Sequence, residues 1–273
     1  MTSYDDLTKV RVTREGPDGL VGVITLNRPE ARNAIDGDLS RELHEVFARV
    51  AKDTDFRAIL LRGEGKSFCV GGDVKMFNAQ QEETNPPSGA QKVAGLLHGA
   101  EVVDLMLAVP QPMVSAVQGH AMGLGSTLAM FCDVMVVADD AKIADTHVNI
   151  GLVAGDGGAV TFPLMLPLGV AKWHLMTGEP ILGADAARLG LALRSVPAED
   201  LYDTALQVAS RFAELPAMAV QGTKATLNRI VRDRMDLTLQ FGLLYEGATF
   251  LSEDHKEAAA AFVERRAPKF TGR

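Results

Sequence analysis

The chain has 273 residues, 47% of them hydrophobic, and a formal net charge of −8 at pH 7. This length and composition predict a substantial buried core, and the negative charge argues against a nucleic-acid partner, because no basic field exists to collect phosphates. No apolar run reaches the roughly 18 residues that span a membrane, and two cysteines are too few for a disulfide framework. These properties favour a cytoplasmic protein that binds neither nucleic acid nor membrane.

Strands and helices alternate through the first two thirds of the chain. Residues 9–15 and 20–26 are β-rich and flank GPDG, a sequence typical of a hairpin turn. Residues 38–51 carry apolar side chains on one helical face, which predicts a helix, and residues 57–63 predict a buried strand. Five further elements are expected in order: a mobile loop at 78–89, a helix at about 90–108, a strand at 112–119, a short helix at 125–132 and a strand at 133–138.

From about residue 199 the hydrophobic pattern is helical to the end, and SEDHKEAAAAFVERR is its last amphipathic segment. No sequence repeat or low-complexity tract interrupts the order of elements. Alternating strands and helices followed by helices alone predict an α/β core over residues 1–198 and a helical region over residues 199–273.

Two stretches share a strand, then glycines, then the start of a helix. They are SFCVGGDVKMF, with Gly71 and Gly72, and GHAMGLGSTLAM, with Gly123. Glycine permits close approach of the backbone to a ligand, and a helix start exposes free N–H groups, so two converging turns of this kind would form an oxyanion hole. Each turn alone has an ordinary structural explanation. A dinucleotide site is disfavoured because Leu128 stands where its third glycine belongs.

These turns belong to a set of stretches that resembles a known family over nearly the whole chain. The stretches, in order, are LNRPEARNAI, KSFCVGGDVKMF, QPMVSAVQGHAMGLGSTLAMFCDVMVVADDAKIAD, GLVAGDGG and SEDHKEAAAAFVERR. They resemble the crotonase superfamily of enoyl-CoA hydratases and isomerases. The resemblance implies a spiral of ββα units with C-terminal helices that build homotrimers, often paired into hexamers. It also implies an acyl-CoA ligand, no bound cofactor and no metal.

The same resemblance implies where the thioester binds. Its oxygen would lie between the backbone N–H groups of Gly72 and Leu124. Residues on the CoA side would be Gly71, Asp73, Val74 and Lys75, and Arg28 could meet CoA phosphates. Leu124 replaces a residue that is usually glycine, and its N–H remains a usable donor if the local φ is negative.

Acid–base chemistry is where the chain departs from the hydratases of this family. Those enzymes use two glutamates, and by motif the corresponding positions hold Thr127 and His147. A threonine hydroxyl is no base near neutral pH, whereas a histidine can accept a proton. The two-glutamate mechanism is therefore not expected here.

One acid, Asp156, stands among four glycines in HVNIGLVAGDGGAV, residues 147–160. It could cap the helix that starts at Gly157, or it could be a pocket acid whose pKa burial raises and a helix N-terminus lowers. Together with His147 it resembles the 6-oxocamphor hydrolase branch, in which a histidine and an aspartate occupy these places.

The favoured hypothesis is an enzyme that stabilises the enolate of a CoA thioester and moves the proton with Asp156 and His147. Hydration, double-bond isomerisation and hydrolysis stay open, as does the identity of the acyl chain. One alternative is a hydrolase of CoA thioesters or of β-diketones that uses the same two residues. Another is a non-catalytic protein that binds acyl-CoA and keeps the fold and the hole.

Overall fold

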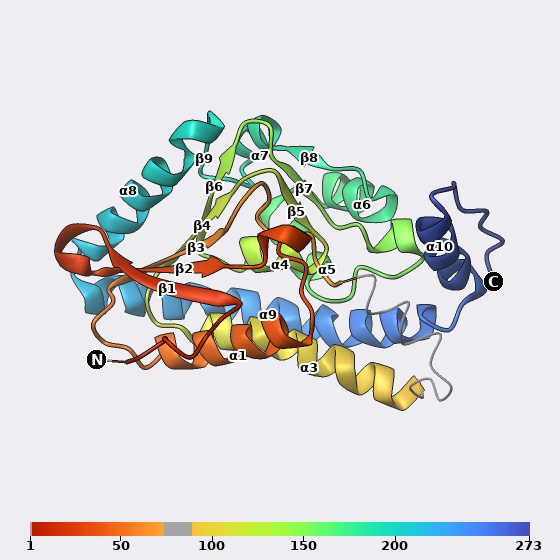
Figure 1. Ribbon diagram of the computed structural model, residues 1–273, viewed down its shortest axis with the longest axis horizontal. Coiled ribbons are helices and arrows are strands. Elements are labelled where there is room, and N and C mark those ends of the chain that lie inside the picture. The colour runs from red at the N-terminus through yellow and green to blue at the C-terminus, as the bar shows by residue number, and fades with distance from the viewer. Residues whose placement is uncertain (1, 74–88) are drawn as a thin grey trace.

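The computed structural model of the chain describes residues 2–73 and 89–273, and for residues 89–94 and 96 it describes the backbone alone. Val74, Lys75 and nearly all of the expected mobile loop at 78–89 lie outside the described residues. The described chain forms two sheets flanked by helices (Figure 1). None of the described helices is both long and apolar enough to cross a membrane.

The larger sheet has six strands in the order β1-β2-β3-β4-β6-β9. Its first two strands form the expected antiparallel hairpin, and all later neighbours are parallel. Parallel strands are covered on both faces, which explains why β2 and β4 are buried at every position. Their bounds are Val10–Glu15, Val21–Leu26, Ala58–Gly63, Met113–Val117, Val134–Ala138 and Arg194–Val196, in sheet order.

A second, smaller sheet consists of β5 (His120–Met122), β7 (Lys142–Ala144) and β8 (Ile181–Leu182) in that order. The sequence patterns do not predict these strands, because two or three residues are too few to show an alternation. Cys69 extends this sheet through an isolated parallel bridge to Ala121. The small sheet is important because both glycine turns follow its strands.

The expected helices are present, with ends that shift by one or two residues. In chain order the α-helices are α1 (Gly37–Val50), α3 (Gly89–Ala108), α4 (Leu124–Met130), α5 (Gly158–Met165), α6 (Leu168–Thr177), α7 (Gly183–Leu189), α8 (Leu201–Ala213), α9 (Ala217–Thr249) and α10 (Glu253–Glu264). Short 3₁₀ helices are η1 (Pro17–Gly19), η2 (Pro29–Ala31), η3 (His147–Ile150) and η4 (Ala198–Asp200). Together they confirm an α/β fold with helices at its C-terminal end.

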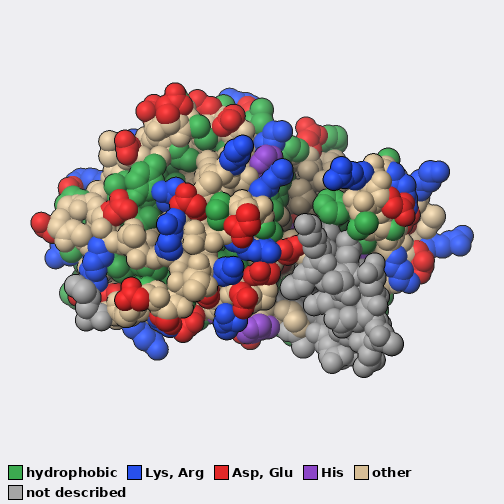
Figure 2. Space-filling model, in the orientation of Figure 1, with side chains coloured by type: hydrophobic (Ala, Val, Ile, Leu, Met, Phe, Trp, Pro, Cys, Tyr) green, Lys and Arg blue, Asp and Glu red, His purple; other side chains and the backbone are tan. Residues whose placement is uncertain are grey.

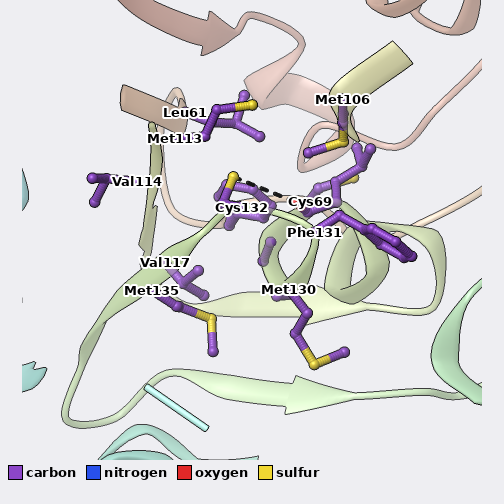
Figure 3. Packing of buried hydrophobic residues seen from close by; sticks show 14 of the residues in the cluster. Leu61, Cys69, Met106, Met113, Val114, Val117, Met130, Phe131, Cys132 and Met135 are labelled. Carbon is purple, nitrogen blue, oxygen red and sulfur yellow. Dashed lines mark hydrogen bonds between the residues drawn. The ribbon is translucent and has the colours of Figure 1, made fainter. Parts of the chain in front are cut away.

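Helices α1, α3 and α9 lie together below the large sheet in Figure 1, and α8 packs against β3 and β4. Between α4, β4 and β6 the core is rich in sulfur, with Met113, Met130 and Met135 around Cys132 (Figure 3). Cys132 and Cys69 are both buried and free, and burial raises the pKa of Cys69 to about 12. Neither thiol is therefore poised as a nucleophile. The expected boundary at residue 198 stays a prediction.

An ion pair made by a buried lysine ties α9 to the core. The ammonium of Lys224 lies 2.7 Å from Asp133 Oδ2 and donates to the carbonyl of Gln111 at 2.8 Å. The Lys224 side chain is 7% exposed, so its charge is compensated by these two partners rather than by water.

We expect the Lys224→Ala variant to lose about 3 kcal/mol of unfolding free energy, because it leaves Asp133 and a buried carbonyl without their cation. Lys256→Ala, which breaks the exposed pair with Glu253, is the matched control and should cost under about 0.5 kcal/mol. Urea unfolding measures both values. Equal losses in the two variants would show that the Lys224 pair does not anchor α9.

Candidate active site

The two glycine turns meet because the strands before them pair. Cys69 N–H donates to the His120 carbonyl at 3.0 Å, and Met122 N–H donates back to the Cys69 carbonyl at 3.0 Å. This register carries residues 71 and 72 past residues 123 and 124. A Cβ built on Gly71 would lie 2.7 Å from the Met122 oxygen and 3.4 Å from the Leu124 nitrogen. The turns expected from the sequence are therefore neighbours.

Both backbone amides named for the oxyanion hole lie at this junction. Leu124 is the first residue of α4, so its N–H has no partner within the helix. The φ of Leu124 is not positive, so its N–H remains a usable donor despite the side chain. Around Gly72, Ile35 N–H donates to the Gly71 carbonyl and Asp73 N–H donates to the Ile35 carbonyl. By the alternation of an extended strand, the N–H of Gly72 faces away from Ile35.

The close approach of the two turns depends on Gly125, the second residue of α4. A Cβ at this position would lie 2.3 Å from the Cys69 carbonyl oxygen. No side chain can be accommodated there unless the strand moves away from the helix. Gly125 therefore holds the distance between the two turns.

The Gly125→Ala variant should be destabilised by about 2 kcal/mol, because overpacking here forces the backbone apart. Gly222→Ala is the matched control, since it also lies within a helix but a Cβ there meets nothing within 4 Å. That control should gain up to about 1 kcal/mol from helix propensity. Denaturant unfolding of the pair checks the difference, and stabilisation of both variants would contradict the close approach.

A buried acid–histidine cluster lies beside the second turn. His147 begins η3, and its Nδ1 lies 2.6 Å from Asp145 Oδ1. Its Nε2 lies 3.4 Å from Asp156 Oδ2 and 3.8 Å from Glu246 Oε1. The ring is also close to the turn, since a Cβ on Gly123 would lie 3.5 Å from His147 Cε1. Neighbouring carboxylates raise the pKa of His147 well above its ordinary value, although burial opposes them.

Asp156 is a buried acid and not a helix cap. The N-cap of α5 is Gly157, and no side chain bonds to the free amides there, so the capping interpretation is wrong. Asp156 Oδ1 instead accepts a hydrogen bond from the Thr127 hydroxyl at 3.2 Å. Burial raises the pKa of Asp156, and His147 partly offsets this rise. Asp156 is thus a buried carboxyl group beside a histidine, and its role as a pocket acid stays a prediction.

Sequence reasoning missed two members of the cluster, Asp145 and Glu246. Glu246 lies on α9 and is 3% exposed, and burial raises its pKa to about 8. The expectation for residues 199–273 was a helical region only, with no part in the site. The available signal was weak: a single acid within the otherwise apolar stretch FGLLYEGATF.

The residues expected on the CoA side are only partly brought into the site. Gly71 lies at the junction of the turns. Arg28 donates to Asp73 Oδ2 at 2.8 Å and lies 3.2 Å from Asp36 Oδ2, so two of the expected CoA contacts are paired with each other. Contact of these residues with CoA stays a prediction, as does that of Val74 and Lys75.

Two groups of side chains in the described part of the chain could hold a metal ion. Asp145, His147 and Asp156 form one, and His44, His98 and Glu101 form the other, with donor atoms in each group within 4.8 Å of one another. In the first group the histidine nitrogens already face carboxylate oxygens. The expectation of no metal and no bound cofactor stays a prediction.

Comparison with known proteins gives a consistent result along the chain. Residues 17–273 match the family model described as Enoyl-CoA hydratase/isomerase. An (E)-benzylidenesuccinyl-CoA hydratase of Thauera aromatica is 36% identical over 259 residues, covering 92% of this chain and 96% of that protein. A short-chain-enoyl-CoA hydratase of Clostridium acetobutylicum is 32% identical, covering 91% of this chain and 93% of that protein. The crystal structure of an enoyl-CoA hydratase/isomerase from Mycobacterium paratuberculosis superposes with a TM-score of 0.85 at 33% identity, over 94% of this chain and 99% of that one.

Proposed function

The chain belongs to the enoyl-CoA hydratase/isomerase family of enzymes, and from this premise we propose that it converts an acyl-CoA thioester through an enolate. The observation that carries the proposal is the position of the His147 ring against the turn that presents the Leu124 amide. A carbonyl oxygen held at that turn would bring the carbon beside it close to Asp156 and His147. This is the arrangement that proton transfer next to a carbonyl requires.

In the proposed mechanism the amides of Gly72 and Leu124 bind the thioester oxygen. Negative charge grows on this oxygen as the enolate forms, and fixed backbone donors stabilise it without reorganisation. Loss of one such donor typically costs roughly 2.7–4 kcal/mol of transition-state stabilisation. The apposition of the two turns supports this role, because both amides come from the same junction.

Asp156 is proposed to move the proton, with His147 as its partner. Among the four ionisable groups, the His147 and Asp156 side chains keep 12% and 13% exposure, whereas Asp145 is fully buried. The exposed edges can reach a substrate, and Asp145 can only hold the ring. By motif Thr127 and His147 would occupy the places of the two hydratase glutamates, and both side chains contact Asp156. Asp156 alone would thus transfer the proton in this site, where hydratases use two glutamates.

Hydrolysis of a CoA thioester or of a β-diketone is the second candidate. It is favoured by the 2.6 Å contact between His147 Nδ1 and Asp145, because a carboxylate that holds the ring as an imidazolium lets it protonate a leaving group while Asp156 activates water. A purely binding role is disfavoured, since the family is one of enzymes and a binder has no use for a buried acid–histidine cluster.

The Asp156→Asn variant should lose at least about 100-fold in kcat/KM, because the amide keeps the shape but cannot accept a proton. Three assays identify the reaction: hydration of crotonyl-CoA, the double-bond shift of a 3-enoyl-CoA and hydrolysis of an acyl-CoA. Asp140→Asn, an exposed aspartate, is the control and should leave all three rates unchanged. Equal rates for wild type and Asp156→Asn would remove Asp156 from the mechanism.

We also propose that further copies of the chain cover α9, giving the homotrimer or hexamer expected from the family resemblance. Leu237, Phe241 and Leu244 recur at helical spacing and are 60–66% exposed, which is unusual for large apolar side chains in a row. The face visible in Figure 2 instead mixes acidic and basic side chains.

The Phe241→Glu variant should shift the protein to a smaller assembly, because a charge in a buried apolar contact is costly. Sedimentation measures the mass of both proteins. Met218→Glu is the control, since Met218 is 89% exposed but stands outside the Leu237–Leu244 stripe. A wild type that sediments as a monomer would refute the assembly.

A further inference from the structure

We infer that Glu246 is a positioning residue of this site, kept as an uncharged carboxylic acid so that Asp156 remains the ionisable base. Its catalytic consequence rests on the proposed function, whereas its protonation state can be tested without any substrate. Nothing in the sequence pattern assigned a role to this position.

The packing of α9 against the loop before α5 delivers Glu246 to the cluster. A Cβ built on Gly155 would lie 2.5 Å from Glu246 Oε2 and 2.7 Å from the Gly242 carbonyl oxygen. A Cβ on Gly242 would in turn lie 3.1 Å from the Gly155 Cα. Helix and loop touch backbone to backbone at this pair of glycines. The carboxyl group one turn further along the helix therefore has a fixed position beside His147.

The charges of the cluster cannot all be present together. Asp145, Asp156 and Glu246 face one cation, His147, and no other cation forms an ion pair with them within the described chain. Three carboxylates and one imidazolium would leave two net negative charges in a nearly dry environment. Like charges held this close raise the pKa of one member until it takes up a proton.

The hydrogen bonds indicate which carboxyl group takes that proton. Asp145 accepts from the ring and from the backbone N–H of His147, and Asp156 accepts from the Thr127 hydroxyl. Among described residues Asp145 Oδ2 and Glu246 Oε2 both lack a hydrogen-bond partner. Asp145 is still stabilised by the two bonds to its Oδ1, whereas Glu246 Oε1 only lies 3.8 Å from the His147 ring. The anion is thus least stabilised at Glu246, in agreement with a pKa raised by burial to about 8.

Among the described helices near this part of α9, none adds a charge to the cluster. Helix α5 has no titratable side chain, and His255 of α10 contacts the carbonyl of Ile150. On α3, Asp104 pairs with Arg232 of α9. A proton on Glu246 leaves His147 between two carboxylates, Asp145 and Asp156. Of these two, Asp156 has the exposed edge and is the group able to accept the substrate proton.

The Glu246→Gln variant tests this state because glutamine copies the shape of a neutral acid. We expect the kcat/KM of the wild type to decline above about pH 8, as Glu246 ionises, and we expect this decline to be absent from the variant. A Glu246 that is ionised at neutral pH would instead give no decline with a midpoint of about pH 8 in the wild type. Identical pH profiles for wild type and Glu246→Gln would mean that Glu246 has only a structural role. Either result overturns the inference.

A second measurement needs no activity. The pKa of Glu246 is about 8 in the folded protein and near the ordinary 4.5 when unfolded, so wild type loses stability from this group as pH rises between those values. The Tm of Glu246→Gln minus that of wild type should therefore increase from about pH 5 to about pH 8 and then level off. A difference that is constant or falls with pH refutes the neutral acid, whatever becomes of the Asp156→Asn assays.

Infrared spectra of the wild type cover the case in which the Gln variant does not fold. A protonated carboxyl band should disappear with a midpoint of about pH 8 and should persist in Asp156→Asn, which removes the other buried candidate. Absence of any such band at about pH 6 would mean that Glu246 is ionised and the inference is wrong.

Discussion

One short stretch of parallel pairing, between Cys69 and β5, is the constraint on which the candidate site depends. Two backbone hydrogen bonds fix its register, and both glycine turns follow it directly. A slip of one residue would turn the amides of that strand to the opposite face, since alternate residues of a strand point in opposite directions. The position of a proposed catalytic oxygen site is therefore set by backbone pairing, with no side chain of special chemistry involved.

Around that backbone frame, the site combines groups from the α/β core and from α9. The core contributes three residues that follow β7 in the chain: Asp145, His147 and Asp156. Glu246 comes from α9, a helix of 33 residues in the C-terminal third. Burying these charges costs stability, and only their mutual contacts and hydrogen bonds offset the cost. Ionisable groups that are buried together at a cost in folding stability are typical of functional sites, where perturbed pKa values are needed for proton transfer at neutral pH.

Sequence reasoning predicted the features that have a local physical signal. The hairpin, the amphipathic α1 and the large-sheet strands up to β6 have a clear local pattern, and the glycine turns have a composition of their own. Sequence reasoning did not find β5, β7, β8 and β9, because strands of two or three residues carry no periodicity. It also could not find Glu246, since the contact between α9 and Gly155 joins segments about 90 positions apart and depends on tertiary packing. For Asp156 it left a cap and a pocket acid open, and the cap is ruled out by the start of α5 and by the hydrogen bond from Thr127.

The two glycines that flank Asp156, Gly155 and Gly157, are explained by the helices that pack against this loop from both sides. On one side, α9 approaches until a side chain at Gly155 would meet Glu246. On the other side, α4 approaches until a side chain at Gly157 would lie 2.5 Å from Thr127 Cγ2, and Gly157 has φ 141°, which residues with a side chain rarely adopt. Asp156 stands between these two contacts, so its carboxyl group is held between the hydroxyl of Thr127 and the ring of His147. A loop with side chains at these positions would stand further from both helices, and the acid would then face water and keep its ordinary pKa.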